Sequence, residues 1–563
     1  MKHENRISVE HQFLLAVVLL LLLEVFLFRN VLFNDKLLSE IGDGRLTMLI
    51  TEHWFHVFCG DASLTELGIF YPTKNTIAYS DMMLGFGFLH SVFRALGVNV
   101  FLSFKYTIII FHVVGTLSVF YLLNKVLSVD TFWSLCGTIA FSFSNAFSIV
   151  FWHTQMLCIM LLPIVIINAV RLIQCITDRK KRNIHALTII VCLAIILYTA
   201  WYIAFFSALF FLTLAIIIII QLIIEGKLKG IWEACCRNNN LLIDFVAWVI
   251  IGIILIIPFA LIELSVLNSS GAWGYDSICQ TLLPEPIDII KTPDNLLFGW
   301  LPEILNLSQR LFDSNIYEGY SIAVILMFIY TLSFSFRVKK DSNNRNMIMV
   351  AQSAAIAVII GLIMVVRVGE NATSLWWLIY NYFPGGKAIR AAGRYVFYLS
   401  LPLTLSMAVL GNAVSSSKSN NNPGKRRKIA FRSIILMLLI VSGIHVGGVY
   451  STWSISEANR VVDGIKEAPE DCSCFFITRV SPDSSYIYGD AFQISDFVGV
   501  PTINGFSGAV PPGYGNIWDP GSESYFTDVK KWISEKNLDN VYGYDCVSKE
   551  WKKYSAEDNL DRN

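Results

Sequence analysis

Long apolar runs dominate this sequence and restrict what it can fold into. A helix crosses a bilayer with about 20 apolar residues, and about eleven runs of that length are present. Hydrophobic residues make up 55% of the chain and charged residues 15%, whereas soluble domains carry roughly 25% charged residues. We therefore predict a mainly α-helical, polytopic membrane protein. The runs lie at 12–29, 101–123, 131–150, 153–174, 185–200, 203–224, 242–263, 319–336, 346–366, 391–412 and 432–450.

Clusters of Lys and Arg in the short connections predict the orientation of the runs. They lie before the first run and after the fourth, sixth, eighth and tenth runs, so alternate threading places them all on one side. Cytoplasmic loops carry an excess of Lys and Arg. We therefore expect a cytoplasmic N-terminus, with the first apolar run retained as an anchor. The outer side then holds the loops 30–100, 264–318 and 367–390 and the tail 451–563.

The chain divides into two predicted domains, a transmembrane domain at 1–450 and an outer domain at 451–563. The outer domain contains strand-like runs such as CFFITRV and SYIYGD, a turn-rich stretch and a helical pattern at 525–536. This mixture predicts a small α/β domain. The stretch 82–97 is apolar but too short to span a bilayer, which indicates a re-entrant or interfacial helix.

Several functional classes are disfavoured by the sequence. The 43 Lys and Arg residues balance the 43 Asp and Glu residues, which argues against a general nucleic-acid binder. The sequence has no phosphate-binding P-loop, dinucleotide fingerprint, Cys-x-x-Cys pair or Gly-x-Ser-x-Gly elbow. Polar residues that could take part in catalysis or ligand binding gather instead in the predicted outer loops.

Asp43 is the first candidate catalytic residue. It is flanked by Gly42 and Gly44, which let the backbone turn sharply and approach a ligand. A carboxylate at this position is suited to act as a general base toward a hydroxyl group or to hold a divalent cation such as Mg²⁺ or Mn²⁺. The alternative is a capping residue of the helix that follows.

Glu52 and His56 share one face of that helix because they are four residues apart. Glu and His at this spacing can contribute to a metal site, although the order Glu-His-x-x-His differs from the zinc-protease signature. A structural role on an interfacial helix is favoured, and both residues are kept as supporting candidates.

Five further polar residues are candidates for contacts with a substrate or a phosphate. Asp81 is either a second acid of the site or the N-cap of the next helix. His153 and Gln155 begin a predicted span, where they contact either a substrate or the membrane interface. Arg45 is a candidate phosphate ligand, and Glu318 either lines the same cavity or marks a helix end.

A second group of candidate residues is basic and consists of Lys387, Arg390 and Arg394, which we call the second constellation. Their spacing predicts one cationic stripe on a helix entering the tenth span. Cations on the outer side break the positive-inside trend, and charges at a membrane tend to be functional. Arginine grips phosphate oxygens with two parallel hydrogen bonds, so a lipid-linked phosphate is a suitable partner. Binding of ordinary lipid headgroups is the alternative.

Five stretches carry a resemblance to a known family. They are GDGRLTMLITEHWFHVF, IFYPTKNTIAYSDMMLG, WHTQ, FPGGKAIRAAGRYVF and VPTINGFSGAVPPGY. Together with the long first outer loop, the many spans and the outer C-terminal domain, they resemble the GT-C-fold glycosyltransferases, and in particular a group of bacterial GT-C-like membrane proteins. The resemblance implies that Asp43 is the catalytic base.

The same resemblance implies an inverting hexosyl- or pentosyltransferase in the bacterial inner membrane. The donor would be a polyprenyl-phosphate-linked sugar and the acceptor an envelope glycan such as O-antigen, a lipid or a protein. Lys387, Arg390 and Arg394 would stabilise the departing lipid phosphate. No Asp-x-Asp pair is found in the first loop, so metal dependence stays open. A flippase for lipid-linked sugars and a non-catalytic assembly protein are the competing interpretations.

Overall fold

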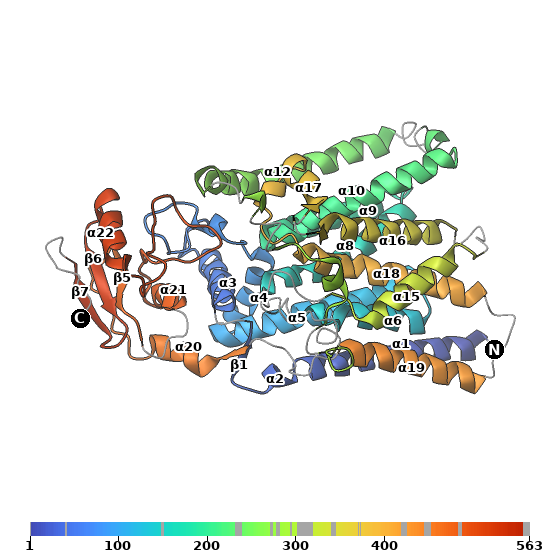
Figure 1. The fold of residues 1–563 in the computed structure, drawn as a ribbon, viewed down its shortest axis with the longest axis horizontal. Coiled ribbons are helices and arrows are strands. Elements are labelled where there is room, and N and C mark those ends of the chain that lie inside the picture. The colour runs from blue at the N-terminus through green and yellow to red at the C-terminus, as the bar shows by residue number, and fades with distance from the viewer. Residues whose placement is uncertain are drawn as a thin grey trace.

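A computed structural model shows an elongated molecule with a helical bundle at one end and a small α/β region at the other (Figure 1). The structure describes residues 2–39, 42–147, 151, 153–230, 233, 239–270, 274–276, 282–292, 295–300, 319–338, 345–369, 371, 373–417, 425–443, 452–481 and 487–554. The prediction of a mainly helical membrane protein with a small α/β region is confirmed.

Eight segments of the described chain are helical, long and apolar enough to cross a membrane. Three of the predicted runs instead contain shorter apolar helices, namely α6 (Thr131–Ser142), α15 (Ile322–Ser335) and the 429–443 part of α19 (Lys425–Gly443). The eight segments are provided by α1 (Lys2–Leu27), α5 (Val100–Tyr121) with η2 (Leu122–Val126), η3 (Thr154–Leu161) with α8 (Leu162–Gln174), α9 (Arg179–Thr199), α10 (Trp201–Ile224), α12 (Asn239–Ser270), α16 (Arg345–Val365) and α18 (Arg394–Ser417).

Helix α18 forms the centre of the bundle, and α12 lies along one edge (Figure 1). The buried share of the most apolar part is 83% for α18 and 6% for α12. Small residues let α6 approach α18 closely, since a Cβ atom on Gly137 would lie 2.8 Å from the Cβ of Ala408. Close backbone packing at small residues is a principal source of helix association in membranes.

Several arginines of the basic clusters form ion pairs with acidic residues of neighbouring helices. Arg179 and Arg182, at the start of α9, both bind Asp244 near the start of α12. Arg345, at the start of α16, pairs with Glu225 after α10 at 3.0 Å. The two chain termini lie at opposite ends of the long axis (Figure 1). Assignment of the basic end to the cytoplasm stays a prediction.

The first outer loop is well structured. It contains α2 (Arg29–Leu32), strand β1 (Lys36–Leu38), α3 (Asp43–Cys59), η1 (Thr76–Tyr79) and α4 (Leu84–Ala95). The short helix predicted at 82–97 is thus present as α4. Helix α3 ends at Gly60, whose φ of 85° is left-handed and suits glycine.

The tail forms a three-stranded sheet in the order β5-β6-β7. Strands β5 (Cys474–Arg479) and β6 (Val541–Asp545) are parallel, and β7 (Glu550–Lys553) pairs antiparallel with β6. The same part of the chain contains three helices, namely α20 (Ile455–Val462), α21 (Ile487–Val498) and α22 (Tyr525–Glu535). The predictions of a strand at CFFITRV and a helix at 525–536 are confirmed.

The predicted strand at SYIYGD is wrong, because α21 begins at Ile487 within it. Ala491 and Ile494 on α21 are buried against the β5 and β6 side chains Phe475 and Tyr544. Apolar residues three to four positions apart present one face of a helix. Packing of that face on the sheet therefore outweighs the local strand preference of Tyr and Ile.

The first loop and the tail are joined by extensive hydrogen bonding. Strand β1 pairs antiparallel with β4 (Thr452–Ser454). The Thr502 amide donates to the Gly68 carbonyl at 2.8 Å, and the Tyr71 amide donates to the Thr502 carbonyl at 3.1 Å. The Trp532 indole donates to the Tyr71 carbonyl at 2.8 Å. A domain boundary at 451 stays a prediction, but the outer region is built from both parts of the chain.

Several short elements precede α18 in the chain, within the predicted outer loops. They are η4 (Pro286–Ile290), the hairpin of β2 (Arg367–Val368) and β3 (Thr373–Ser374), α17 (Trp376–Tyr382) and η6 (Gly386–Ala388). Of the predicted outer loops, 367–390 is largely described, whereas most of 264–318 lies outside the described residues.

Candidate functional site

Asp43 begins α3 and faces His153, which directly precedes η3. The Oδ2 atom of Asp43 lies 3.0 Å from Nδ1 of His153. The Asp43 side chain is 38% exposed and that of His153 only 8%, so the carboxylate keeps access to a ligand while the imidazole is buried. Gly42, not Asp43, occupies the N-cap of α3, and no side-chain cap is formed there. Asp43 is therefore placed for contact with His153 rather than for capping.

The arginines of the second constellation act on this pair. The positive charges of Arg390 and Arg394 both influence Asp43 and His153. Burial acts to raise the pKa of Asp43, but the hydrogen bond and charge of His153, with the two arginines, hold that pKa below its usual range. Burial and Arg394 together hold the pKa of His153 below its usual value. At neutral pH the site then holds an ionised carboxylate, a neutral imidazole and two guanidinium groups.

The predicted single helical stripe of cations is wrong. Lys387 lies in η6, Ile389 is extended, and Arg394 is the first residue of α18. The amides of Arg390 and Ala391 donate to the Tyr202 hydroxyl, at 3.1 and 3.0 Å. Tyr202 thereby replaces the helical carbonyls that these amides would otherwise bind. The Arg394 guanidinium also lies over the Tyr202 ring, 5.1 Å from its centroid.

Asp81 is close to the same group. Its Oδ1 atom accepts the Trp201 amide at 2.8 Å, so it caps α10 across space, while Met83 is the N-cap of α4. The charge of Arg394 and a hydrogen bond from Gln155 both act on Asp81. Burial raises the pKa of Asp81 to about 6, and these partners offset only part of the burial. The structure thus brings together Asp43, Asp81, His153, Gln155, Arg390 and Arg394.

The charges around Asp43 suit an anion better than a cation. A Mg²⁺ or Mn²⁺ ion bound there would face the guanidinium groups of Arg390 and Arg394, which repel it. The same groups attract a phosphate. In the described ranges, Asp43 belongs to no group of three potential metal ligands.

Four candidates from the sequence lie elsewhere. Arg45 is buried and pairs with Asp490 of α21 at 2.5 Å, so it joins α3 to the tail. Glu52 is buried and binds His90 at 2.6 Å, and His56 lies beside it on α3. Lys387 is exposed, with its ammonium 6.0 Å from the Tyr380 ring centroid. Glu318 lies outside the described residues.

Sequence reasoning missed Tyr202, which shapes the segment that carries Arg390. Its only signal was its position in the turn between two predicted spans, directly after Trp201. It also missed Asp490 and Asp496 on α21, which contact α3. Nothing local marks them, because their partners lie more than 400 residues earlier in the chain.

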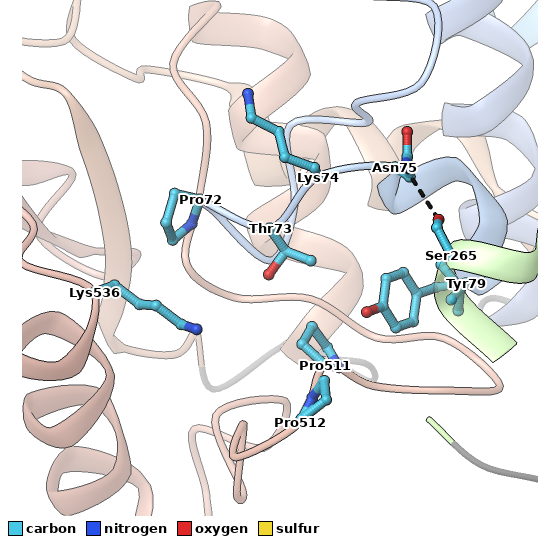
Figure 2. Close-up of a pocket in the computed structure, with 10 residues that line it drawn as sticks. Pro72, Thr73, Lys74, Asn75, Tyr79, Ser265, Pro511, Pro512 and Lys536 are labelled. Atoms are coloured by element: carbon cyan, nitrogen blue, oxygen red, sulfur yellow. Dashed lines mark hydrogen bonds between the residues drawn. The ribbon is translucent and has the colours of Figure 1, made fainter. Parts of the chain in front are cut away.

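A separate pocket of about 420 Å³ has a lining that includes none of the residues of the charged group. It is formed by the first loop, the end of α12 and the tail, and it joins the stretches YPTKN and VPPG. In Figure 2 the Tyr79 hydroxyl and the Lys536 ammonium point toward its centre, whereas Lys74 extends away. The Asn75 amide donates to the Ser265 hydroxyl at 3.1 Å. Tyr79 is two residues from Asp81, so one segment links the pocket to the charged group.

Comparisons with known proteins yield structural likenesses only. No family model matches the chain, and no curated protein matches it. The chain is similar to the mycobacterial arabinofuranosyltransferase AftD, with 13% identity, a TM-score of 0.46, and coverage of 87% of this chain and 32% of that one. It thus spans about a third of that protein.

Two further solved structures are similar to this chain. The Archaeoglobus fulgidus oligosaccharyltransferase shares 11% identity, with a TM-score of 0.46 and coverage of 94% of this chain and 69% of that one. ArnT from Cupriavidus metallidurans, bound to undecaprenyl phosphate, shares 10% identity, with a TM-score of 0.34 and coverage of 90% and 91%. The TM-scores of these three structures are all below 0.5, so the likenesses do not support a functional assignment.

Proposed function

We propose that this protein is a membrane glycosyltransferase that transfers a sugar from a polyprenyl-phosphate donor to a hydroxyl of an envelope glycan, a lipid or a protein. One observation carries the proposal. An ionised, accessible carboxylate, Asp43, contacts a buried histidine within the field of two arginines at one end of an apolar bundle. This combination supplies both a base for a hydroxyl and a binding place for a phosphate.

The donor phosphate would bind Arg390 and Arg394. Both residues lie where the chain enters α18, and Tyr202 fixes the backbone between them. Charge-assisted hydrogen bonds to phosphate are short and strong, and arginine forms them in pairs. The prenyl chain would extend along the apolar helices, and α12, whose most apolar part is only 6% buried, presents an apolar surface for it. Lys387 is exposed and would add only a peripheral charge.

Transfer would follow a single displacement. Asp43 accepts the proton of the acceptor hydroxyl as its oxygen attacks the anomeric carbon. The bond between that carbon and the phosphate oxygen breaks, and its electrons leave with the lipid phosphate. Arg390 and Arg394 stabilise the charge that develops there. His153 orients the Asp43 carboxylate, and attack opposite the leaving group inverts the anomeric centre.

The pocket of Figure 2 is the proposed acceptor site. Its lining combines an aromatic ring at Tyr79 with hydroxyl and amide groups at Thr73 and Asn75, and Lys536 adds a positive charge. Such a lining fits a polar, hydroxyl-rich acceptor. Because Tyr79 lines the pocket and Asp81 belongs to the charged group, an acceptor bound beside Tyr79 would have its hydroxyl directed toward that group.

The proposal is tested by reconstituting the purified full chain in liposomes with a labelled polyprenyl-phosphate sugar. Wild-type protein should release lipid phosphate and transfer the label to an acceptor, and Asp43→Asn should not. A panel of donor sugars and of glycan, lipid and protein acceptors then identifies the two substrates.

The competing flippase function would be supported by ionisable groups deep in the bundle. Glu24 of α1 and His112 of α5 form such a pair at 2.8 Å. However, the other His112 nitrogen lies 3.0 Å from the Ser142 carbonyl, so the imidazole is engaged on both sides. Movement of a fluorescent lipid-linked sugar across the liposome bilayer without sugar transfer would overturn the proposed enzyme activity.

A further inference from the structure

The far end of α3 carries a second group of ionisable residues, remote from Asp43. Glu52 and His56 lie one helical turn apart, and Asp61 follows directly after the helix C-cap. Asp496 of α21 approaches them from the tail. Glu52 is nine residues from Asp43, or roughly 13 Å along a helix with a rise of 1.5 Å per residue.

The distances in this group are those of ligands around an ion rather than of hydrogen bonds. Nε2 of His56 lies 3.6 Å from Oε1 of Glu52 and 3.9 Å from Oδ1 of Asp496. Both distances exceed those of a hydrogen bond. The ligand atoms of the three residues all lie within 4.8 Å of one another. Tetrahedral ligands with bonds of about 2.0–2.2 Å lie roughly 3.3–3.6 Å apart, so a small inward shift would complete a site.

The surroundings of His56 match those of a metal-binding imidazole. Its other nitrogen, Nδ1, lies 3.2 Å from both carboxylate oxygens of Asp61. Metal-binding histidines usually donate this second N–H to a carboxylate, which fixes the tautomer and the ring orientation. Nε2 is thereby directed at Glu52 and Asp496. Glu52 is itself oriented by His90 and by Arg94, whose Nε lies 3.0 Å from both Glu52 oxygens.

The charge of the group also fits a cation. Glu52, Asp61 and Asp496 place three carboxylates around the His56 imidazole, and they outnumber the one guanidinium nearby among the described residues, that of Arg94. Within 4.0 Å of Asp496, the described part of the chain provides one basic atom, His56 Nε2. A divalent cation between these ligands would relieve the repulsion.

We propose that Glu52, His56 and Asp496 bind one Zn²⁺ ion, with Asp61 orienting the imidazole. A mixed imidazole and carboxylate set suits zinc better than Mg²⁺ or Ca²⁺, which prefer oxygen ligands alone. The ion would fasten α21 to α3 and so fix the tail against the helix that begins at Asp43. This role is structural and does not depend on the proposed transferase activity.

The test uses the full chain in detergent, without a polyhistidine tag, stripped with a chelator and then incubated with ZnCl₂ and desalted. Wild-type protein should retain about one zinc ion per chain by mass spectrometry of the metal, and its unfolding temperature should rise on addition of zinc. Asp496→Asn and His56→Ala should lose the bound zinc. Asp61→Asn, which removes only the orienting carboxylate, should weaken zinc binding about 10–100-fold.

Asp490→Asn is the matched control. Asp490 also joins α21 to α3, through Arg45, but it is not a ligand. This variant should lower the unfolding temperature and still retain one zinc ion. The proposal is overturned if wild-type protein retains no zinc, or if Asp496→Asn retains as much as Asp490→Asn. Either result would make the group an ion-pair network. Should His56→Ala fail to fold, the conservative Asp496→Asn and Asp61→Asn variants decide the question.

Discussion

Two parts of α3 each hold a carboxylate beside a histidine, but arginines predominate around one pair and carboxylates around the other. Asp43 and His153 lie among the arginines that enter α18. Glu52 and His56 lie among Asp61 and Asp496. The same pair of residue types thus belongs to a proposed anion site at one end and to a proposed cation site at the other.

The difference teaches that a residue pair does not define a site until its neighbours are known. Asp43 is partly exposed, while Glu52 is buried and bound by His90 and Arg94. An accessible carboxylate can exchange a proton with a ligand, whereas a buried one held by neighbouring side chains stabilises the fold. We therefore expect substitutions at the two ends of α3 to separate activity from stability.

The largest expected effect is at Asp43. Asp43→Asn should lower the rate of sugar transfer about 10²–10⁴-fold, because general-base help of that size is lost. Its unfolding temperature should stay close to that of the wild type, and Asp35→Asn in the same loop provides the control. Initial rates in liposomes measure the effect. Full activity in Asp43→Asn would remove the functional contrast between the two ends.

At the other end, Glu52→Gln should lower the free energy of unfolding by about 3–5 kcal/mol, since His90 and Arg94 lose their buried counter-charge. Transfer by the fraction that remains folded should stay near the wild-type rate. Thermal unfolding followed together with the transfer assay measures both quantities. A stable Glu52→Gln protein without activity would instead place Glu52 in the reaction.

The arginines allow a finer test of the anion-binding end. Arg394→Ala should raise the KM for the lipid-linked donor about 10–100-fold, because hydrogen bonds to charged groups contribute about 1.5–3 kcal/mol. Arg394→Lys should recover part of the loss, since lysine cannot bind two oxygens at once. Lys387→Ala should change KM at most about fivefold, as expected of an exposed charge. Equal effects at Arg394 and Lys387 would contradict this assignment.

The smallest expected effect concerns pH and Asp81. Burial raises its pKa to about 6 from a usual value of 3.8, so the folded state binds more protons than the unfolded state between these values. Stability from this residue therefore falls as the pH rises through that window. Asn at this position still accepts the Trp201 amide but does not titrate. The unfolding temperature of Asp81→Asn relative to the wild type should be higher at pH 7.5 than at pH 4, and a pH-independent difference would refute the assignment.

Much of the fold follows from local patterns in the sequence. Apolar runs identify the spans, and the helix that begins at Asp43 ends at Gly60, where a left-handed residue is required. The site was only partly predictable. Asp43 and the arginines were recognised as polar residues in outer loops, but the sequence does not show that Tyr202 holds the Arg390 segment out of a helix. Long-range partners such as Asp490 and Asp496 leave no local signal.

The pairing of β1 with β4 has a consequence for biosynthesis. Lys36, which precedes α3, pairs with Ser454 beyond the last apolar helix. A ribosome adding about 5–20 residues per second needs roughly 20–80 s to make the intervening chain. During that interval the loop carrying Asp43 has no partner strand. A nascent chain halted before β4 would hold every residue of the charged group around Asp43, yet lack the strand that secures the loop, so assembly of this region must wait until β4 has been synthesised.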